Sequence, residues 1–233
     1  MTIRLLAIET ATEACSVALW DDGAVRERFE IAPRRHTELV LPWADALLAE
    51  SGVAKSQLDA IAVGRGPGAF TGVRLAIAIA QGIALALDRP IVPVSTLATL
   101  ALRAPGQRIL AAIDARMGEV YLGAFERDEE GLIAPCGDEQ LLRPDAAQPL
   151  AGADWIGVGS GFSAQDRALV RALDSCLAST DVQALPHAAD LARLAAHAFA
   201  QGRVLAPERV EPAYLRDKVA LTLAEQSAAR DGG

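Results

Sequence analysis

The feature that most constrains the fold is a glycine-rich run between a strand-like segment and a long apolar segment. Residues 64–74 read Gly-Arg-Gly-Pro-Gly-Ala-Phe-Thr-Gly-Val-Arg, and they separate residues 59–63 from the helix pattern of residues 75–87. Glycine accepts positive φ angles and close backbone approach, while proline fixes φ and removes a hydrogen-bond donor. The run therefore predicts a shaped turn between a strand and a helix, with Thr71 as the helix N-cap. The residues assigned to this structural turn are Gly64, Gly66, Pro67, Gly68, Thr71, Gly72 and Arg74.

The same turn is a candidate phosphate cradle, because its glycine spacing matches part of the dinucleotide-binding pattern. That pattern expects an acidic residue at the end of the next strand, where it would hold a ribose. Here the next strand ends at Val94-Ser95, and no Lys-Ser or Lys-Thr pair follows the glycines as a Walker loop requires. Pro67 also lacks an N–H. We therefore interpret the turn as a rigid corner that aims the following helix, with any bound ligand secondary.

The composition predicts a folded protein with one large or two small domains. The chain has 233 residues, of which 52% are hydrophobic and 22% charged, so a substantial core is available. Its formal net charge of −8 argues against a stand-alone nucleic-acid-binding protein, because neutralising phosphates requires a basic face. Work on RNA inside a complex remains open, since other subunits could supply the positive charge.

The sequence also predicts a cytoplasmic protein with no membrane contact. Cys15, Cys136 and Cys176 have no motif spacing and are expected to be reduced thiols. The N-terminal apolar segment reaches Glu9 too early for a signal peptide, and residues 75–87 are too few to span a bilayer.

The periodicity of the chain predicts two halves that open in the same way. The first has strands at 3–8, 15–20 and 24–30, a helix at 36–50, strands at 59–63 and 91–94, and helices at 75–87 and 95–102. After a boundary at 103–108 come strands at 109–113, 119–125 and near 132, a loop at 136–154, a strand at 154–158, and helices at 163–173 and 190–200. The expected units are residues 1–103, residues 104–217 and a frayed tail at 218–233.

An apolar strand that ends in an acid, followed by a turn and another strand, occurs at Glu9 and again at Asp114. This order suggests a diverged duplication, which is the plan of the actin, sugar-kinase and Hsp70 superfamily, whose acids organise Mg²⁺ beside phosphate-binding glycines. No glycine stands directly after either acid here, where the neighbours are Thr10-Ala11 and Ala115-Arg116. We expect a retained fold without efficient ATP hydrolysis, and a vestigial nucleotide site at Glu9, Thr10, Asp114 and Arg116 remains an open alternative.

Two predicted helices carry apolar faces with two possible uses. The first face comprises Leu39, Val40, Trp43 and Leu47, and the later helix has small residues in one stripe at Ala76, Ala80 and Ala84 and in another at Ala78, Gly82 and Ala86. Such a face packs on the protein's own sheet or receives a partner helix, and both uses are compatible on different faces.

The sequence predicts no metal site, no cofactor and no catalytic nucleophile. The histidines at 36, 187 and 197 lack the i, i+4 spacing that would place two imidazoles on one helix face. Ser160 lies between two glycines but lacks the earlier glycine of a nucleophile elbow.

Five segments together resemble the bacterial TsaB (YeaZ) family. They are residues 7–19, the glycine turn 64–74, Val94-Ser-Thr-Leu97, Asp114-Ala-Arg-Met-Gly-Glu-Val-Tyr121 and Pro212-Ala-Tyr-Leu-Arg216. The resemblance implies an α/β, two-lobed, actin-like (ASKHA, ribonuclease-H-like) fold with duplicated mixed-sheet domains. It also implies a role in forming threonylcarbamoyladenosine beside the anticodon of tRNAs that read codons starting with A.

The resemblance further implies a non-catalytic subunit that binds and activates the TsaD transferase, with the TsaE ATPase joining them and tRNA bound only through the complex. The transferase carries two metal-binding histidines after the strand equivalent to residues 91–94, where this chain has Ser95-Thr-Leu-Ala-Thr-Leu100. The family pairs through its N-terminal helices, which implies a heterodimer interface, and a homodimer when the chain is alone, at Leu39, Val40, Trp43, Leu47, Ala76, Ala78, Ala80 and Gly82. The alternative is an enzyme in its own right, either an actin-fold ATPase or acyl transferase or a metallopeptidase-like protein.

Overall fold

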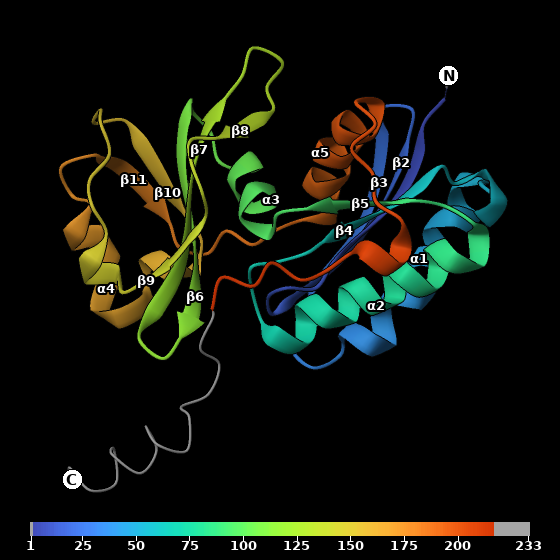
Figure 1. Cartoon of the computed structure of the whole chain (residues 1–233), viewed down its shortest axis with the longest axis horizontal. Helices are drawn as coiled ribbons and strands as arrows, with labels where there is room; N and C mark the ends of the chain where they lie inside the picture. The colour runs from blue at the N-terminus through green and yellow to red at the C-terminus, as the bar shows by residue number, and fades with distance from the viewer. Residues whose placement is uncertain (1, 217–233) are drawn as a thin grey trace, which may run out of the picture.

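The computed structural model describes residues 2–216 and has two α/β lobes, each built on a mixed sheet (Figure 1). The first sheet has the order β3-β2-β1-β4-β5, and the second has the order β11-β10-β6-β7-β8, with β9 also paired to β7. The expected tail at 218–233 and residue 217 lie outside the described residues.

The strands of the first sheet are β1 Arg4–Glu9, β2 Ala14–Asp21, β3 Ala24–Ile31, β4 Ala60–Gly64 and β5 Ile91–Val94. Those of the second are β6 Arg108–Arg116, β7 Glu119–Arg127, β8 Ile133–Pro135, β9 Gln140–Leu142, β10 Trp155–Val158 and β11 Leu177–Asp181. The helices are α1 His36–Ser51, α2 Phe70–Leu87, α3 Thr96–Leu102, α4 Ala164–Ala172 and α5 Ala188–Ala200. Short 3₁₀ turns lie at Lys55–Gln57, Pro144–Ala146, Ser160–Phe162 and Pro207–Arg209.

The two sheets repeat one plan, which confirms the predicted α/β fold with duplicated mixed sheets. In the first, β1 pairs antiparallel with β2 and parallel with β4, and β4 pairs parallel with β5. In the second, β6 pairs antiparallel with β7 and parallel with β10, and β10 pairs parallel with β11. The strands β1 and β6 therefore occupy equivalent central positions, and each delivers its acid, Glu9 or Asp114, to the turn that follows.

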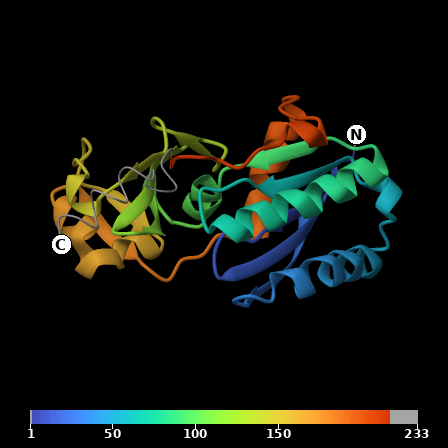
Figure 2. The same ribbon diagram turned by 60° about the horizontal axis from the view of Figure 1, so that its bottom comes forward.

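Helices cover both faces of the first sheet, because its strands alternate apolar side chains between two cores. Leu6 and Ile8 of β1 point toward α1 and α2, whereas Leu5 and Ala7 point toward α5. In Figure 2, α1 and α2 lie along one face of this sheet and α5 lies along the other.

Packing crosses the division expected between residues 103 and 104 in both directions. The helix α5 packs on all five strands of the first sheet, and Leu205 beyond it bridges to Ile91. Conversely, α3 packs on β6 and β7, with Leu97 and Leu100 in the core of the second lobe. The division into two folding units stays a prediction, but the lobes of the folded protein are not contiguous segments.

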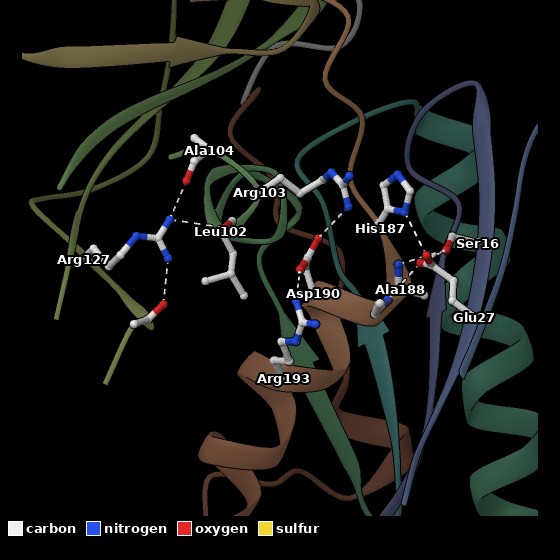
Figure 3. A network of polar contacts seen from close by, with 12 residues as sticks. Ser16, Glu27, Leu102, Arg103, Ala104, Arg127, His187, Ala188, Asp190 and Arg193 are labelled. Carbon is white, nitrogen blue, oxygen red and sulfur yellow. Dashed lines mark hydrogen bonds and ion pairs between the residues drawn. The ribbon is translucent and has the colours of Figure 1, made fainter. Parts of the chain in front are cut away.

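A polar network fastens the N-terminal end of α5 to the first lobe (Figure 3). The carboxylate of Glu27 accepts hydrogen bonds from Ser16 Oγ at 2.7 Å and Ala189 N at 3.0 Å, and it contacts His187 Nδ1 at 2.9 Å. Burial raises the pKa of Glu27, but these hydrogen bonds outweigh burial and hold the pKa below its usual value. A carboxylate at a helix N-terminus also interacts favourably with the positive end of the helix dipole.

Asp190 joins the two lobes in the same network, where its buried carboxylate meets Arg103 at 3.1 Å and Arg193 at 2.8 Å (Figure 3). Because Arg103 follows α3 and Arg193 lies on α5, this carboxylate links a helix of each lobe.

Several local expectations differ from the structure. The helix α2 begins at Phe70 with Ala69 as its N-cap, so Thr71 is inside the helix and does not cap it. The expected loop 136–154 contains β9 and a 3₁₀ turn, and the edge strand β11 was not predicted because its sequence, Leu-Ala-Ser-Thr-Asp, is short and polar.

One helix of the described chain, α2, is long and apolar enough by itself to cross a membrane. The helix is longer than the range 75–87 expected from the sequence, because it begins at Phe70. The helix nevertheless buries five side chains against the first sheet, at Val73, Ala76, Ile77, Ala80 and Ala84, and so forms part of the lobe's core.

Candidate functional site

The glycine turn lies directly against the turn between β1 and β2. Ala69 N donates to Ala11 O at 2.7 Å, and Thr10 Oγ1 donates to Gly72 O at 2.7 Å. A Cβ added to Gly68 would lie 2.5 Å from Ala11 O, and one added to Gly72 would overlap Thr10 O. Glycine is required at these two positions because the two backbones approach too closely for a side chain.

The far side of the turn is tied to the end of β5. Arg65 N donates to Val94 O and Thr96 N donates to Gly66 O, each at 2.9 Å, and the Gly66–Pro67 peptide bond is cis. The turn is thus held on both sides by backbone hydrogen bonds. Carbonyl oxygens repel an anion, so the carbonyls facing the turn support its interpretation as a structural corner more than as a phosphate cradle.

The acid of the first hairpin, Glu9, is enclosed. Its Oε1 accepts a hydrogen bond from Ala11 N at 2.7 Å and its Oε2 accepts one from Thr96 Oγ1 at 3.1 Å. Desolvation by burial raises the pKa of Glu9 to about 7, against the lowering effect of these hydrogen bonds. Thr10 is fully buried beside it. Neither side chain faces open space where a magnesium nucleotide could bind.

The acid of the second hairpin is accessible. Asp114 lines the space between the lobes, accepts a hydrogen bond from Arg116 N at 2.8 Å and pairs with Arg116 Nη1 at 3.0 Å. Of the four residues of the suggested vestigial site, Glu9 and Thr10 are therefore buried, whereas Asp114 and Arg116 line the cleft between the lobes. Within residues 2–216, no group of three or more His, Cys, Asp and Glu side chains lies close enough together to hold a metal ion.

A cleft of about 1140 Å³ opens between the lobes beside the glycine turn. It is lined by the β1–β2 turn, the segment before α1, the start of α2, the β6–β7 turn and the segment Pro212–Arg216. Three large apolar or aromatic side chains on this cleft are strongly exposed: Phe70 at 62%, Tyr214 at 57% and Met117 at 82%. Sequence reasoning missed all three as site residues, although all three lie within segments that carried the family resemblance.

The segment Pro212–Arg216 straps one lobe to the other (Figure 1). On the first lobe, Ala213 N donates to Arg65 O at 2.8 Å, and Arg74 Nη2 donates to Tyr214 OH at 2.9 Å. On the second lobe, Arg216 Nη2 lies 2.8 Å from Glu119 Oε2 and donates to Ala115 O at 3.2 Å. We call these five residues the strap.

A second surface lies on the outward side of α2, where Ala78 and Gly82 are exposed and Leu85 is 63% exposed. The helix α1 lies on the same face of the first sheet as α2, and its Leu41 is also exposed. We call Leu41, Ala78, Gly82 and Leu85 the outer helix face.

The structure corrects half of the expected interface residues. Val40, Leu47, Ala76 and Ala80 are buried in the first lobe's core because they face the sheet, so they offer no surface in the single chain. Leu39 and Trp43 are partly buried against the same core. Only Ala78 and Gly82 of the expected set are freely exposed.

Comparison with known proteins agrees with this architecture. The family model for tRNA N6-adenosine threonylcarbamoyltransferase, TsaD, matches residues 29–223. The tRNA threonylcarbamoyladenosine biosynthesis protein TsaB of Escherichia coli is 46% identical over 227 residues, which cover 94% of this chain and 96% of that protein. The Haemophilus influenzae protein of the same name is 38% identical over 231 residues, which cover 93% and 95%.

A solved structure, YeaZ from Pseudomonas aeruginosa, superposes with a TM-score of 0.85 at 46% identity and covers 91% of this chain and 100% of its own. The sequence likeness extends along nearly the whole chain and the fold likeness includes both lobes. The chain therefore belongs to the TsaB (YeaZ) family.

Proposed function

We propose that the chain is a non-catalytic subunit in the synthesis of tRNA threonylcarbamoyladenosine, which binds and activates a TsaD-type transferase. A TsaE-type ATPase would join the pair, and the modified base would be the adenosine next to the anticodon in tRNAs that read codons starting with A. The proposal follows the names of its relatives and the match to the transferase model. Its expected place of action is the cytoplasm.

The observation that carries the proposal is the outer helix face. The helix α2 exposes Ala78, Gly82 and Leu85, and α1 on the same face of the sheet exposes Leu41, so apolar surface is left uncovered on an otherwise well-packed lobe. Small residues allow a partner helix to approach closely, and contiguous exposed apolar surface marks interaction sites. A stable heterodimer buries about 1,200–2,000 Å², so the partner would also cover surface around this face. The same face would form the homodimer when the transferase is absent.

The enclosure of Glu9 supports a non-catalytic role. An acid that is hydrogen-bonded to Ala11 N and Thr96 Oγ1, with its pKa raised to about 7, is poorly placed to organise Mg²⁺. Of the two acids that the fold would use for a nucleotide, only Asp114 lines the cleft.

Co-purification tests the proposal directly. The full chain is expressed with the transferase and ATPase subunits, and tRNA modification is measured with and without it. We expect Ala78→Glu to abolish pairing and modification, because a charge on the outer helix face would be buried without a partner. The matched control is Ala200→Glu, at an exposed position of α5 on the opposite face of the sheet. Full complex formation by a folded Ala78→Glu variant would overturn the assignment of this face.

The enzyme alternative has its own readout. Robust ATP hydrolysis or peptidase activity by the purified chain alone, lost in Asp114→Asn, would replace the non-catalytic assignment.

A further inference from the structure

The cleft between the lobes combines exposed aromatic surface with positive charge. Phe70 and Tyr214 are each more than half exposed there, and Met117 is almost wholly exposed. A folded protein rarely leaves several large apolar side chains open at one hollow unless that hollow receives a ligand.

Four arginines line the same cleft: Arg34, Arg74, Arg116 and Arg216. The acids on its lining are Glu13 and Asp114. The whole chain carries 30 acidic and 22 basic residues, so the charge of the cleft is opposite in sign to that of the protein. The cleft is therefore a local site for an anion on a molecule that otherwise repels anions.

Two of these arginines keep their charge available. Arg116 pairs with Asp114 and Arg216 pairs with Glu119. Within residues 2–216, neither Arg34 nor Arg74 forms an ion pair with a carboxylate. These two guanidinium groups, one before α1 and one in the second turn of α2, thus have unneutralised charge at the cleft.

The guanidinium of Arg74 is also held in a fixed orientation. Its central carbon lies 3.3 Å from the ring centroid of Phe70 and 5.1 Å from that of Tyr214, and it donates hydrogen bonds to Phe70 O and Tyr214 OH. The aromatic rings of Phe70 and Tyr214 and the planar guanidinium of Arg74 therefore lie together on the cleft. This is the surface on which unpaired bases stack while phosphates meet arginine.

We propose that the cleft binds unpaired nucleotides of an RNA substrate, with phosphates at Arg34 and Arg74 and bases against Phe70 and Tyr214. This inference rests on the proposed function, from which it takes the RNA to be the tRNA handled by the complex. A closed duplex hides the faces of its bases, so the ligand chemistry is that of a single-stranded loop. Because the chain's net charge is −8, the cleft contributes to RNA binding mainly within the complex.

Binding of a fluorescent RNA hairpin with an anticodon loop tests this site in the assembled complex. We expect Arg34→Gln/Arg74→Gln to raise the Kd about tenfold or more. The slope of log Kd against log salt concentration should fall by roughly 1.4, since each single-strand phosphate contact contributes about 0.7. The control is Arg26→Gln/Arg203→Gln, which removes the same charge at two exposed positions outside the cleft and should leave both quantities unchanged.

Photo-cross-linking gives a second readout. A hairpin carrying 4-thiouridine in its loop should attach to peptides of this chain that contain Phe70 or Tyr214, and Tyr214→Ala should weaken hairpin binding about tenfold. A fully paired RNA of the same length should compete poorly.

An unchanged Kd and salt slope in the double arginine variant, or cross-links that map only to the other subunits, would overturn the site. The site would also be overturned if the double arginine variant lost the ATPase subunit from the complex but still bound RNA normally. That result would show the cleft to be a protein-binding surface. If the wild-type chain fails to pair with the transferase, the proposed function fails. In that event the hairpin titration of the chain alone at low salt still decides the cleft.

Discussion

A carboxylate oxygen of Glu9 occupies the space that a side chain on residue 64 would need. A Cβ added to Gly64 would overlap Oε2 of Glu9 and lie 2.6 Å from its Cδ. The acid that ends β1 and the glycine that ends the neighbouring strand β4 are therefore one packing unit. This unit explains both the enclosure of the acid and the glycine at the first position of the turn.

The first prediction concerns Gly64→Ala, which should destabilise the fold by roughly 1–3 kcal/mol through overpacking. Urea unfolding of the full chain measures the loss. In a double-mutant cycle, Glu9→Ala should restore part of that stability, because it removes the side chain that the new methyl group meets. Additive effects of the two substitutions would contradict the proposed contact.

The second prediction concerns pH. Burial raises the pKa of Glu9 from 4.5 to about 7, so between these values the folded chain holds a proton that the unfolded chain has released. The free energy of unfolding should therefore decrease as pH rises through this range. Above it, the full cost of burying the ionised carboxylate, roughly 3 kcal/mol, applies. Glu9→Gln has no charge to bury. Relative to the wild type it should gain about that much stability between about pH 5 and pH 8 in urea unfolding. An equal difference between the two proteins at both pH values would show that the acid titrates normally.

Local patterns in the sequence were enough for the hairpins and for most strands and helices. The apolar run of β1 is a short-range feature, and the structure places β1, β2 and β3 close to the strands predicted at 3–8, 15–20 and 24–30. The edge strand β11 has no comparable signal, because Leu177 is its only large apolar residue.

The attachment of α5 to the first lobe could not be read from the chain. It depends on Glu27 reaching Ala189 N and on Ser16 reaching Ala188 N, contacts between residues far apart in sequence. The cleft was missed for a related reason. In the sequence Phe70 is one apolar residue of the glycine turn. The fold shows that its side chain is exposed and that Arg74 lies over both its ring and that of Tyr214.

The same limit explains the interface residues. Ala76 and Ala78 belong to stripes of similar composition, and only the position of the sheet decides which stripe is buried. The third prediction separates them. Val40→Glu should unfold the chain, since it places a charge in the core without a partner, whereas Ala78→Glu should leave the free energy of unfolding nearly unchanged. Circular dichroism and urea unfolding of the free chain measure both, and a well-folded Val40→Glu protein would contradict the burial described here.

The fourth prediction uses Gly82, which lies on the exposed side of α2 with no atom within 4 Å of an added Cβ. Gly82→Ala should stabilise the chain by roughly 0.5–1 kcal/mol, because glycine in a helix interior loses more conformational entropy than alanine. Gly68→Ala is the contrasting variant, since its methyl group would meet Ala11 O. A loss of stability in Gly82→Ala would mean that the outer side of α2 is not free.

The last prediction concerns the strap. Arg216 is the link through which the strap holds the β6–β7 turn, by its contacts with Glu119 and with Ala115 O. Arg116 and Met117 in that turn have positive φ angles, which non-glycine residues adopt only when surrounding contacts hold them. Arg216→Ala removes those contacts and leaves Glu119 without its cation.

We therefore expect faster amide hydrogen exchange at the β6–β7 turn in Arg216→Ala, and a loss of roughly 1–2 kcal/mol in global stability. Arg143→Ala, which breaks a solvent-exposed pair with Asp145, should change neither quantity measurably. Exchange at Leu110 in the centre of β6 should accelerate in Arg216→Ala only by the factor that the loss of global stability sets, because that residue is buried within the second lobe. Unaltered exchange at the turn in Arg216→Ala would mean that the hairpin holds its own conformation, and the strap would then act on the first lobe alone, through Ala213 and Tyr214.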